Sequence, residues 1–419
     1  MDKRQTPVTF ALRPHQQRAL DAMLLNAKGQ VLVPTGGGKT FIMIQDAIRQ
    51  LQNPATIVVV APRILLAEQL CAEFLEFIDT TNVHVMHVHS GETHHFHSTK
   101  TDKIALFNNT ARAAGESCII FTTYHSLNRV IDAGIDIDCA YFDEAHNSCT
   151  RHFFTAVAAC SLHSRSSYFF TATPRTSRNH GRGMNNPMVF GNVICNVPAP
   201  ELIENGSIIP PVVVPIETNI DRTKDSAAQV DANTVSSIID SLDDSAAAKV
   251  LVAAPSSKIL GRMLGQSDML QQLKDRGYDV LHITSKFGAY VNDKKVGREV
   301  FFDTLTAWGK DPSRKFVVFH YSILSEGINV PGLTHCILLR NLNIVEMAQT
   351  IGRVIRIDRD DAADIAAGKI PAGQCQFYRK SCGFVSVPVH NNHGAATIKR
   401  LQNVVDAIFI KGIPPLSLV

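Results

Sequence analysis

Residues 33–40 read VPTGGGKT, and this stretch decides the fold that the sequence predicts. A short apolar run at residues 30–33 leads into the glycines, and an apolar-rich segment of helical length at residues 41–50 follows them. A glycine-rich turn between a strand and a helix points backbone N–H groups, and the positive end of the helix dipole, at a bound phosphate. The stretch therefore predicts a phosphate-binding loop in an α/β fold.

The residues of this loop have separate expected roles. The backbone of four residues would surround the phosphates: Thr35, Gly36, Gly37 and Gly38. Lys39 would reach the β- and γ-phosphates of a nucleotide, and the hydroxyl of Thr40 would bind Mg²⁺. Such loops usually have glycine where this chain has Val33, so a glycine-rich turn that merely precedes Lys39 is the alternative.

Two adjacent carboxylates stand further along the chain, in the sequence DEAH at residues 143–146. The apolar run at residues 139–142 is typical of a strand, so Asp143 and Glu144 would lie at its carboxyl end, where ligands bind in open α/β sheets. Asp143 would hold Mg²⁺, and Glu144 would orient and deprotonate the attacking water. An acidic strand end that caps a helix is the alternative.

Eight segments in this order resemble the motifs of a superfamily 2 helicase with a DEAH motif. They lie at residues 12–16, 61–69, 122–127, 143–146, 171–174, 252–256, 325–331 and 349–356. The segments at 143–146, 325–331 and 349–356 are the specific ones, whereas those at 61–69, 122–127 and 252–256 are loose by themselves. The resemblance runs from residue 12 to residue 357.

The resemblance implies an α/β fold with two tandem RecA-like domains, each a mainly parallel sheet flanked by helices. ATP and Mg²⁺ would occupy the cleft between the domains, where Gln16 would read the adenine and Gly327 would contact the nucleotide. Gln349, Arg353 and Arg356 would serve catalysis, with Arg356 favoured over Arg353 as the contact to the γ-phosphate. A solvated basic helix end is the alternative for the two arginines.

The resemblance also assigns four residues to the nucleic-acid strand: Arg63, Thr123, Tyr124 and Arg175.

Because Arg353 and Arg356 are three residues apart, they are expected on one face of a short helix. These expectations complete the set of residues that the sequence assigns to ATP hydrolysis and to nucleic acid.

The spacing of apolar runs supports the fold independently. Short β-branched runs alternate with helix-length segments such as residues 65–78 and 257–276, as in parallel sheets of βαβ units. Prolines are densest at residues 197–215, which places domain 1 at residues 1–210 and domain 2 at 211–419. Residues 221–231 are polar and predict an exposed loop.

Composition limits how the protein could bind nucleic acid and in which cellular compartment it is expected. The 41 Lys and Arg residues against 38 Asp and Glu leave a net charge of +3, so nucleic acid would bind a local groove rather than a global basic field. The basic stretches at residues 175–182 and 286–298 could follow a backbone or be solvated loops. The nine scattered cysteines, no signal peptide and no bilayer-length apolar run predict a soluble, cytoplasmic protein with free thiols.

Two regions invite a metal interpretation that their spacing does not favour. Six histidines lie within residues 84–97, where a polar strand and loop surface is the preferred interpretation. The second region holds Cys375, Cys382, His390 and His393, and its residues 377–378 and 384–387 are expected to be hairpin strands. We expect zinc at neither region; whether the histidine-rich one binds anything stays open.

The glycine-rich loop, the TYHSL sequence at 123–127 and the INVP sequence at 328–331 most resemble the DNA-translocating branch of these helicases, which includes restriction-enzyme motors and UvsW-like helicases. The expected function is an ATP hydrolase that couples hydrolysis to movement along DNA or to its unwinding. An RNA helicase of the DEAH type and the motor subunit of a restriction complex are the alternatives. A protein partner in replication, recombination or restriction is an open option.

Overall fold

The structure is a computed structural model, and it describes residues 12–179, 181–242, 247–321 and 330–419. Contacts divide the chain into two compact units, whose main parts are Gly38–Val197 and Pro198–Pro415. The first unit also includes the chain up to Pro34 and Leu416–Val419, and the second also includes Thr35–Gly37.

The predicted boundary after residue 210 was not recovered as a break at that point, and it stays a prediction. The segment just before it contacts the second unit, because the Ile209 N–H donates to the Ile355 carbonyl oxygen at 2.9 Å. Ile208 also forms an antiparallel bridge with Arg356. These contacts hold residues 208 and 209 to the second unit, whose main part begins at Pro198.

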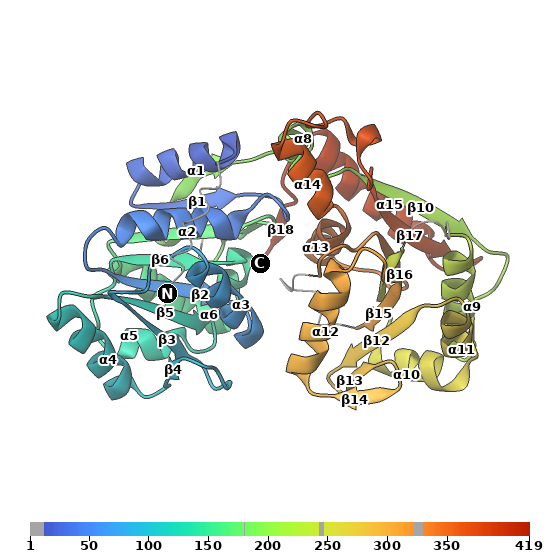
Figure 1. Cartoon of the computed structure of the whole chain (residues 1–419), viewed down its shortest axis with the longest axis horizontal. Helices are drawn as coiled ribbons and strands as arrows, with labels where there is room; N and C mark the ends of the chain where they lie inside the picture. The colour runs from blue at the N-terminus through green and yellow to red at the C-terminus, as the bar shows by residue number, and fades with distance from the viewer. Residues whose placement is uncertain (1–11, 180, 243–246, 322–329) are drawn as a thin grey trace, which may run out of the picture. The chain divides into compact units, whose positions relative to one another are not determined.

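The first unit contains an eight-stranded sheet whose neighbouring strands all run parallel (Figure 1). Its order is β4-β3-β5-β2-β6-β7-β1-β9. The strands are β1 (Lys28–Leu32), β2 (Thr56–Ala61), β3 (Val83–Val88), β4 (Phe96–His97), β5 (Ser117–Thr123), β6 (Cys139–Phe142), β7 (Ser166–Thr171) and β9 (Asn192–Asn196). A separate two-stranded parallel sheet joins β8 (Arg175–Thr176) to β18 (Ser417–Leu418).

Helices cover both faces of this sheet, which is why its central strands are continuous apolar runs. The helices are α1 (Pro14–Leu25), α2 (Lys39–Gln50), α3 (Ile64–Leu75), α4 (Thr101–Ala113), α5 (Leu127–Asp132), α6 (Arg151–His163) and α7 (Pro187–Phe190), with a 3₁₀ turn η1 (Ala145–Cys149). Val58 and Val60 of β2 belong to one apolar cluster with residues of α4 to α7. Phe74 of α3 packs edge-on against Phe121 of β5 at 5.5 Å.

The second unit contains a mixed eight-stranded sheet in the order β10-β17-β16-β11-β15-β12-β13-β14. The strands are β10 (Pro211–Glu217), β11 (Lys249–Ala253), β12 (Asp279–Thr284), β13 (Gly288–Val291), β14 (Lys294–Val296), β15 (Phe316–His320), β16 (His335–Leu338) and β17 (Gly383–Val389). The first six strands in that order are parallel, and β13 and β14 add an antiparallel meander. Pro215 lies in the edge strand β10, where a missing N–H costs no ladder bond.

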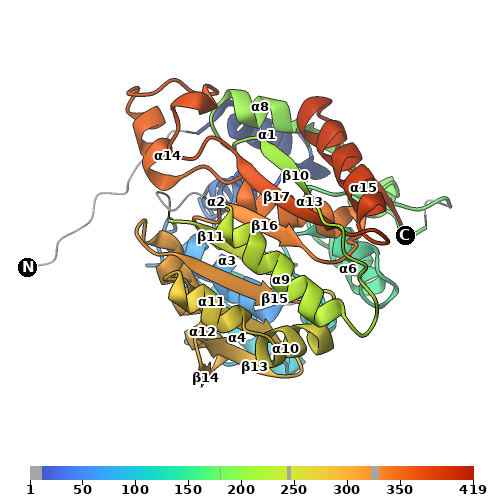
Figure 2. The same ribbon diagram turned by 90° about the vertical axis from the view of Figure 1, so that its right-hand side faces the viewer.

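Helices flank this second sheet as well (Figure 2). They are α8 (Ala199–Glu204), α9 (Ala227–Asp240), α10 (Ser257–Gln266), α11 (Met269–Asp275), α12 (Arg298–Lys310), α13 (Ile344–Val354), α14 (Arg359–Ala366) and α15 (Ala395–Val405), with a 3₁₀ turn η2 (Cys375–Phe377) and a π-helical turn η3 (Asp406–Ile410). Residues of α9, α10 and α11 form one apolar cluster with β11, β12, β15 and β16. The predicted fold class, two mainly parallel sheets flanked by helices, is confirmed.

Two predicted elements of the second unit are wrong in detail. The helix expected over residues 257–276 is interrupted, because the Ser267 hydroxyl donates to the Met263 carbonyl and accepts from the Met269 N–H, in place of continued helical bonding. Residues 377–378 form no hairpin strand: Phe377 ends η2, and β17 pairs in parallel with β10 and β16.

The prediction of an exposed loop over residues 221–231 is also wrong for the C-terminal end of that segment. Helix α9 begins at Ala227, and Asp231 is only 1% exposed. The Arg222 guanidinium donates to both carboxylate oxygens of Asp231, at 2.7 Å each, and this pairing makes the burial of a charge tolerable. The pattern of polar residues in the sequence did not reveal this ion pair.

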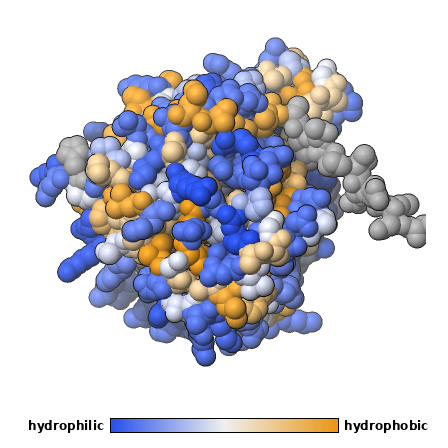
Figure 3. Space-filling model, turned by 90° about the vertical axis from the view of Figure 1, so that its left-hand side faces the viewer, coloured by the Kyte–Doolittle hydropathy of each residue, from blue (hydrophilic) through white to orange (hydrophobic). Residues whose placement is uncertain are grey.

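On the face in Figure 3, apolar side chains gather in several patches among polar ones. The most exposed large apolar residues include Leu25, Met188 and Ile410. Among the described residues, we find no helix with the length and apolar character that crossing a bilayer requires.

Candidate functional site

Five of the predicted motif segments follow neighbouring parallel strands of the first sheet. In the order β5-β2-β6-β7-β1, each strand is followed at its carboxyl end by one of them: Tyr124, Pro62–Arg63, Asp143–His146, residues 172–174 and residues 33–40. Carboxyl ends of parallel strands lie along the same edge of a sheet, which is where ligands bind in α/β proteins. The fold therefore gathers these segments along one edge.

The glycine-rich loop connects β1 to α2, the context predicted from the sequence. Gly36 and Gly38 have φ values of 90° and 81°, a conformation that favours glycine, and α2 begins at Lys39. Gln16 lies against the loop, because a Cβ on Gly38 would come within 2.5 Å of its Nε2 atom. The N–H of Arg13 holds the other end of that amide, donating to Gln16 Oε1 at 3.0 Å.

Lys39 and Glu144 face each other at this edge of the sheet. The Lys39 Nζ atom lies 3.7 Å from Glu144 Oε1, and the two side chains are only 10% and 8% exposed. Glu144 has a φ of 44°, an uncommon conformation for a residue with a side chain. The structure thus brings the cation of the loop and the acidic motif together.

Asp143 precedes Glu144 and shares its surroundings. Burial, followed by the neighbouring Glu144 charge, raises the pKa of Asp143 above its usual range, and Lys39 opposes the shift. The backbone is fixed by Tyr124, whose hydroxyl donates to the Asp143 carbonyl oxygen at 2.8 Å. Burial disfavours the ionised form of this carboxylate, and a cation bound beside it would offset that cost.

His146 connects the acidic motif to the segment after β7, a link that the sequence did not predict. Its Nδ1 atom lies 3.0 Å from Thr171 Oγ1, 3.3 Å from Thr173 Oγ1 and 3.5 Å from Glu144 Oε2. His146 is 4% exposed. The only signal in the sequence was that both segments belong to the same set of helicase-like motifs.

The residues predicted to contact nucleic acid differ in accessibility. Arg63, just before α3, and Arg175, in β8, are partly exposed. Thr123 and Tyr124 are buried at 3% and 2% exposure. With its ring enclosed and its hydroxyl bonded to the Asp143 carbonyl, Tyr124 positions the acidic motif in this arrangement.

The motif-like segment at residues 349–356 spans the end of α13. The helix begins with a reciprocal cap, in which the Glu346 N–H donates to Asn343 Oδ1 at 2.9 Å. Gln349 and Arg353 lie in the helix and are buried at 5% and 4% exposure. The prediction that Arg353 and Arg356 share one helix is wrong, because α13 ends at Val354 and Arg356 bridges to Ile208. Gly327 lies outside the described residues.

His320, the last residue of β15, is a buried titratable group close to these arginines. It is 1% exposed, and among the described residues neither of its ring nitrogens has a hydrogen-bond partner. Burial, followed by the charges of Arg353 and Arg340, lowers the pKa of His320 to about 3. The folded protein therefore holds this imidazole neutral at pH values where the unfolded chain protonates it.

We expect the free energy of unfolding to fall as the pH drops from 7 to 5, because the unfolded chain then binds a proton at His320 and the folded chain does not. His320→Leu should lose less stability over this range, by on the order of 2 kcal/mol. Burial also lowers the pKa values of His282 and His335 to about 4. These two histidines contribute equally to the pH dependence of the wild type and of His320→Leu. Urea unfolding at both pH values measures the difference, and equal losses would contradict it.

The histidine-rich segment is more enclosed than its sequence predicts. His87 and His89 are buried at 0% and 1% exposure, with His87 Nδ1 2.9 Å from His89 Nε2. The prediction of a polar surface is therefore wrong for these two residues. Across the described ranges, no three His, Cys, Asp or Glu side chains are arranged to hold a metal ion.

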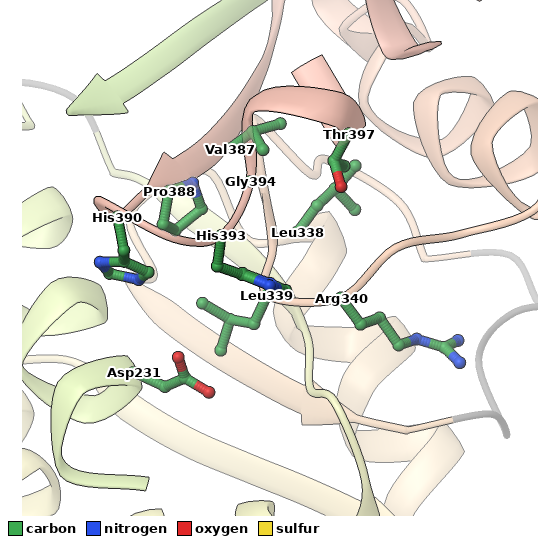
Figure 4. A pocket seen from close by; sticks show the side chains of 10 residues that line it. All are labelled: Asp231, Leu338, Leu339, Arg340, Val387, Pro388, His390, His393, Gly394 and Thr397. Atoms are coloured by element: carbon green, nitrogen blue, oxygen red, sulfur yellow. The ribbon is translucent and has the colours of Figure 1, made fainter. Parts of the chain in front are cut away.

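A pocket in the second unit offers no alternative site (Figure 4). It is lined by Asp231, Leu338, Leu339, Arg340, Val387, Pro388, His390, His393, Gly394 and Thr397. The space that these side chains leave does not admit a water-sized molecule. Asp231 is already paired with Arg222, and His390 Nδ1 lies 2.6 Å from Thr218 Oγ1.

Comparison with known proteins agrees with this arrangement. Residues 9–176 match the family model described as Type III restriction enzyme, res subunit. No curated protein matches the chain.

Three solved structures illustrate the likeness. The ATP-dependent Type ISP restriction-modification enzyme LlaBIII bound to DNA has a TM-score of 0.68 at 16% identity, over 98% of this chain and 31% of that chain. A putative HsdR subunit of a type I restriction enzyme from Vibrio vulnificus YJ016 has a TM-score of 0.60 at 18% identity, over 97% and 68%. S. cerevisiae Dbp5 bound to RNA and ADP BeF3 has a TM-score of 0.55 at 14% identity, over 97% and 89%.

The chain therefore shares its fold with subunits of ATP-dependent restriction enzymes and with Dbp5, which was solved bound to RNA. It spans less than a third of the length of the Type ISP enzymes that it matches, at 31% and 30%.

Proposed function

We propose that this protein is an ATP-dependent DNA translocase or helicase, which couples ATP hydrolysis to movement along DNA or to strand separation. The approach of Lys39 to Glu144 at the carboxyl edge of the first sheet carries the proposal. A nucleotide whose phosphates lay on the glycine-rich loop would meet a cation for its charge and a carboxylate for the attacking water at the same place.

Residues of α1, of the glycine-rich loop and of the acidic motif account for nucleotide binding and for the attacking water. Gln16 contacts the adenine, and the backbone of Thr35, Gly36, Gly37 and Gly38 surrounds the phosphates. Lys39 neutralises phosphate charge, and Glu144 orients and deprotonates the water.

A magnesium ion fits the oxygen donors present, since the Thr40 hydroxyl and the Asp143 carboxylate are the kinds of ligand that Mg²⁺ prefers. The raised pKa of Asp143 supports this assignment, because a cation beside that carboxylate would offset its burial and the repulsion from Glu144. When bound, Mg²⁺ would neutralise the β- and γ-phosphate oxygens. Asp143 and Thr40 would hold it, and Lys39 would hold the phosphates in place.

The second unit supplies the remaining groups of this proposal. We assign the guanidinium groups of Arg356 and Arg353 to the charge that develops on the γ-phosphate, and Gln349 to the same step. Gly327 is assigned to the nucleotide by its place in the motif. Arg63, Arg175 and the backbone near Thr123 are assigned to the nucleic-acid strand.

DNA is favoured over RNA by the match of residues 9–176 to a restriction-enzyme subunit and by the likeness to an enzyme bound to DNA. An RNA helicase is the second candidate, because the RNA-bound Dbp5 structure is matched over 89% of its length. A motor that works with a restriction partner is a variant of the first proposal.

The test is the steady-state ATPase rate of the purified chain with single-stranded DNA, branched DNA and single-stranded RNA. Lys39→Ala serves as the control and is expected to lower the rate by about 10²- to 10³-fold, because it removes a fixed charge from the phosphates. Stimulation by DNA and not by RNA supports the proposal, and stimulation by RNA alone supports the second candidate. A rate that Lys39→Ala leaves unchanged would contradict the assigned site.

A further inference from the structure

A lysine outside the motif-like segments holds the backbone at the end of α13. The Lys380 Nζ atom donates to the carbonyl oxygen of Arg356 at 2.9 Å and to that of Leu333 at 2.6 Å. The last carbonyls of a helix and the residues just after it lack partners within the helix, and a cation at this end also complements the helix dipole. Lys380 therefore supplies a hydrogen-bond donor to the backbone just after α13 ends.

Lys380 is itself held in place by α14. The Asp361 carboxylate is fully buried and accepts hydrogen bonds from the backbone N–H groups of Arg379, at 3.1 Å, and Lys380, at 3.3 Å. The Arg379 guanidinium donates to the same carboxylate at 2.9 Å. The start of the Lys380 side chain is thus fixed relative to α14, which begins at Arg359, three residues after Arg356.

The neighbouring backbone packs against the same helix end. A Cβ on Gly383 would lie 2.4 Å from the Val354 carbonyl oxygen, so β17 begins in direct contact with the last residue of α13. The Gly383 N–H donates to the Pro210 carbonyl oxygen at 3.0 Å, and the Ile209 N–H donates to the Ile355 carbonyl oxygen at 2.9 Å. Residues 354–356 are therefore held from two sides, and Lys380 makes the contact to Arg356 itself.

The charge balance around Lys380 shows that its ammonium is not simply a solvated surface group. Burial lowers the pKa of Lys380 to about 7; the Asp358 charge opposes this shift, and Arg356 adds to it. Placing a cation in this setting costs desolvation energy, which the two short hydrogen bonds to carbonyl oxygens offset.

We propose that Lys380 is a positioning residue for Arg356: by anchoring the Arg356 carbonyl, it fixes the point from which the guanidinium extends toward the γ-phosphate. This inference rests on the role given to Arg356 in the proposed function. Misplacing a catalytic group by about 1 Å can cost 10²-fold in rate, so the anchor matters although Lys380 touches no substrate.

The first experiment compares Lys380→Met, Lys380→Arg and a matched control, Lys369→Met, in DNA-stimulated ATP hydrolysis. Lys369 is exposed, and its ammonium contacts Asp364 only at the surface, 3.0 Å away. Lys380→Met is expected to lower kcat by about 10- to 100-fold. KM for ATP should change little, since Lys39 and Gln16 remain. Lys380→Arg should recover part of kcat, and Lys369→Met should match the wild type.

The second experiment is a double-mutant cycle with Arg356→Ala. If Lys380 acts through Arg356, the double variant with Lys380→Met will be no slower than Arg356→Ala alone. Losses that multiply in the double variant would overturn the inference, as would a normal kcat for Lys380→Met beside a slow Arg356→Ala. In that second case the proposed function would stand without the anchor.

Hydrogen exchange provides a readout that does not depend on hydrolysis. Lys380→Met is expected to raise amide exchange across residues 350–358, whereas Lys369→Met should not. Thermal unfolding of both variants shows whether the fold is intact. If the amide exchange of folded Lys380→Met were unchanged, the anchoring role would be overturned, even if the wild type hydrolysed no ATP. A wild-type protein that hydrolysed no ATP would count against the proposed function alone.

Discussion

Replacing Arg356 with alanine is expected to slow ATP hydrolysis by on the order of 10³- to 10⁵-fold, the effect that arginine fingers have in phosphoryl transfer. The guanidinium would stabilise charge that develops on the γ-phosphate only in the transition state, so kcat should fall more than ATP affinity. Arg356→Lys should recover only part of the rate, because an ammonium lacks the planar fork of donors. Single-turnover hydrolysis with excess enzyme measures this step directly.

Two further variants sharpen that result. Arg400→Ala is the matched control, because Arg400 lies in α15, where its guanidinium donates to Asn341 Oδ1 at 3.1 Å, and it has no assigned role in hydrolysis. Arg353→Ala tests the neighbouring arginine. A larger loss at Arg353 than at Arg356 would exchange their roles, and rates within about tenfold of wild type for both would remove arginine from the mechanism.

Replacing Glu144 with glutamine is expected to lower kcat by about 10²- to 10⁴-fold while ATP remains bound. The amide keeps the shape of the side chain but can no longer accept a proton from water. Lys39, whose Nζ atom lies 3.7 Å from Glu144 Oε1, stays available for the phosphates. Equilibrium binding of ATP and the rate of hydrolysis, measured on the same preparation, separate the two effects.

The control for this variant is Glu116→Gln, which makes the same change in the first unit, where the Glu116 carboxylate contacts His84. It should hydrolyse ATP as the wild type does. Removing this charge should also bring the pKa of Asp143 closer to its usual range, because Glu144 is the largest charge that raises it. If Glu144→Gln hydrolysed ATP at the wild-type rate, another base would have to be sought.

The parts of the fold that the sequence predicts well are those set by local pattern. The apolar runs at residues 30–33 and 139–142 lie in or directly after β1 and β6, because strands buried on both faces need continuous apolar residues. The glycines at 36–38 lie between a strand and a helix, as a phosphate-binding loop requires.

The errors have a common physical cause, which is that specific side-chain and backbone contacts overrode the local pattern, and one of these contacts joins residues distant in sequence. Asp231 was expected in an exposed loop and is buried because Arg222 pairs with it. Ser267 interrupts an expected helix through its own hydroxyl. Arg356 leaves α13 because its backbone pairs with Ile208, a residue from before the second sheet begins.

The chemistry of glycine, lysine and carboxylate side chains is local, so the sequence alone predicts which residues could bind a nucleotide and shows their order along the chain. Which of these residues lie close together follows from the packing of the folded chain. The strand order β5-β2-β6-β7-β1 brings Lys39 to Glu144 and His146 to Thr171, and the contact of β17 with α13 brings Lys380 to Arg356. Such pairs depend on how strands line up in the sheets, which no short stretch of sequence encodes.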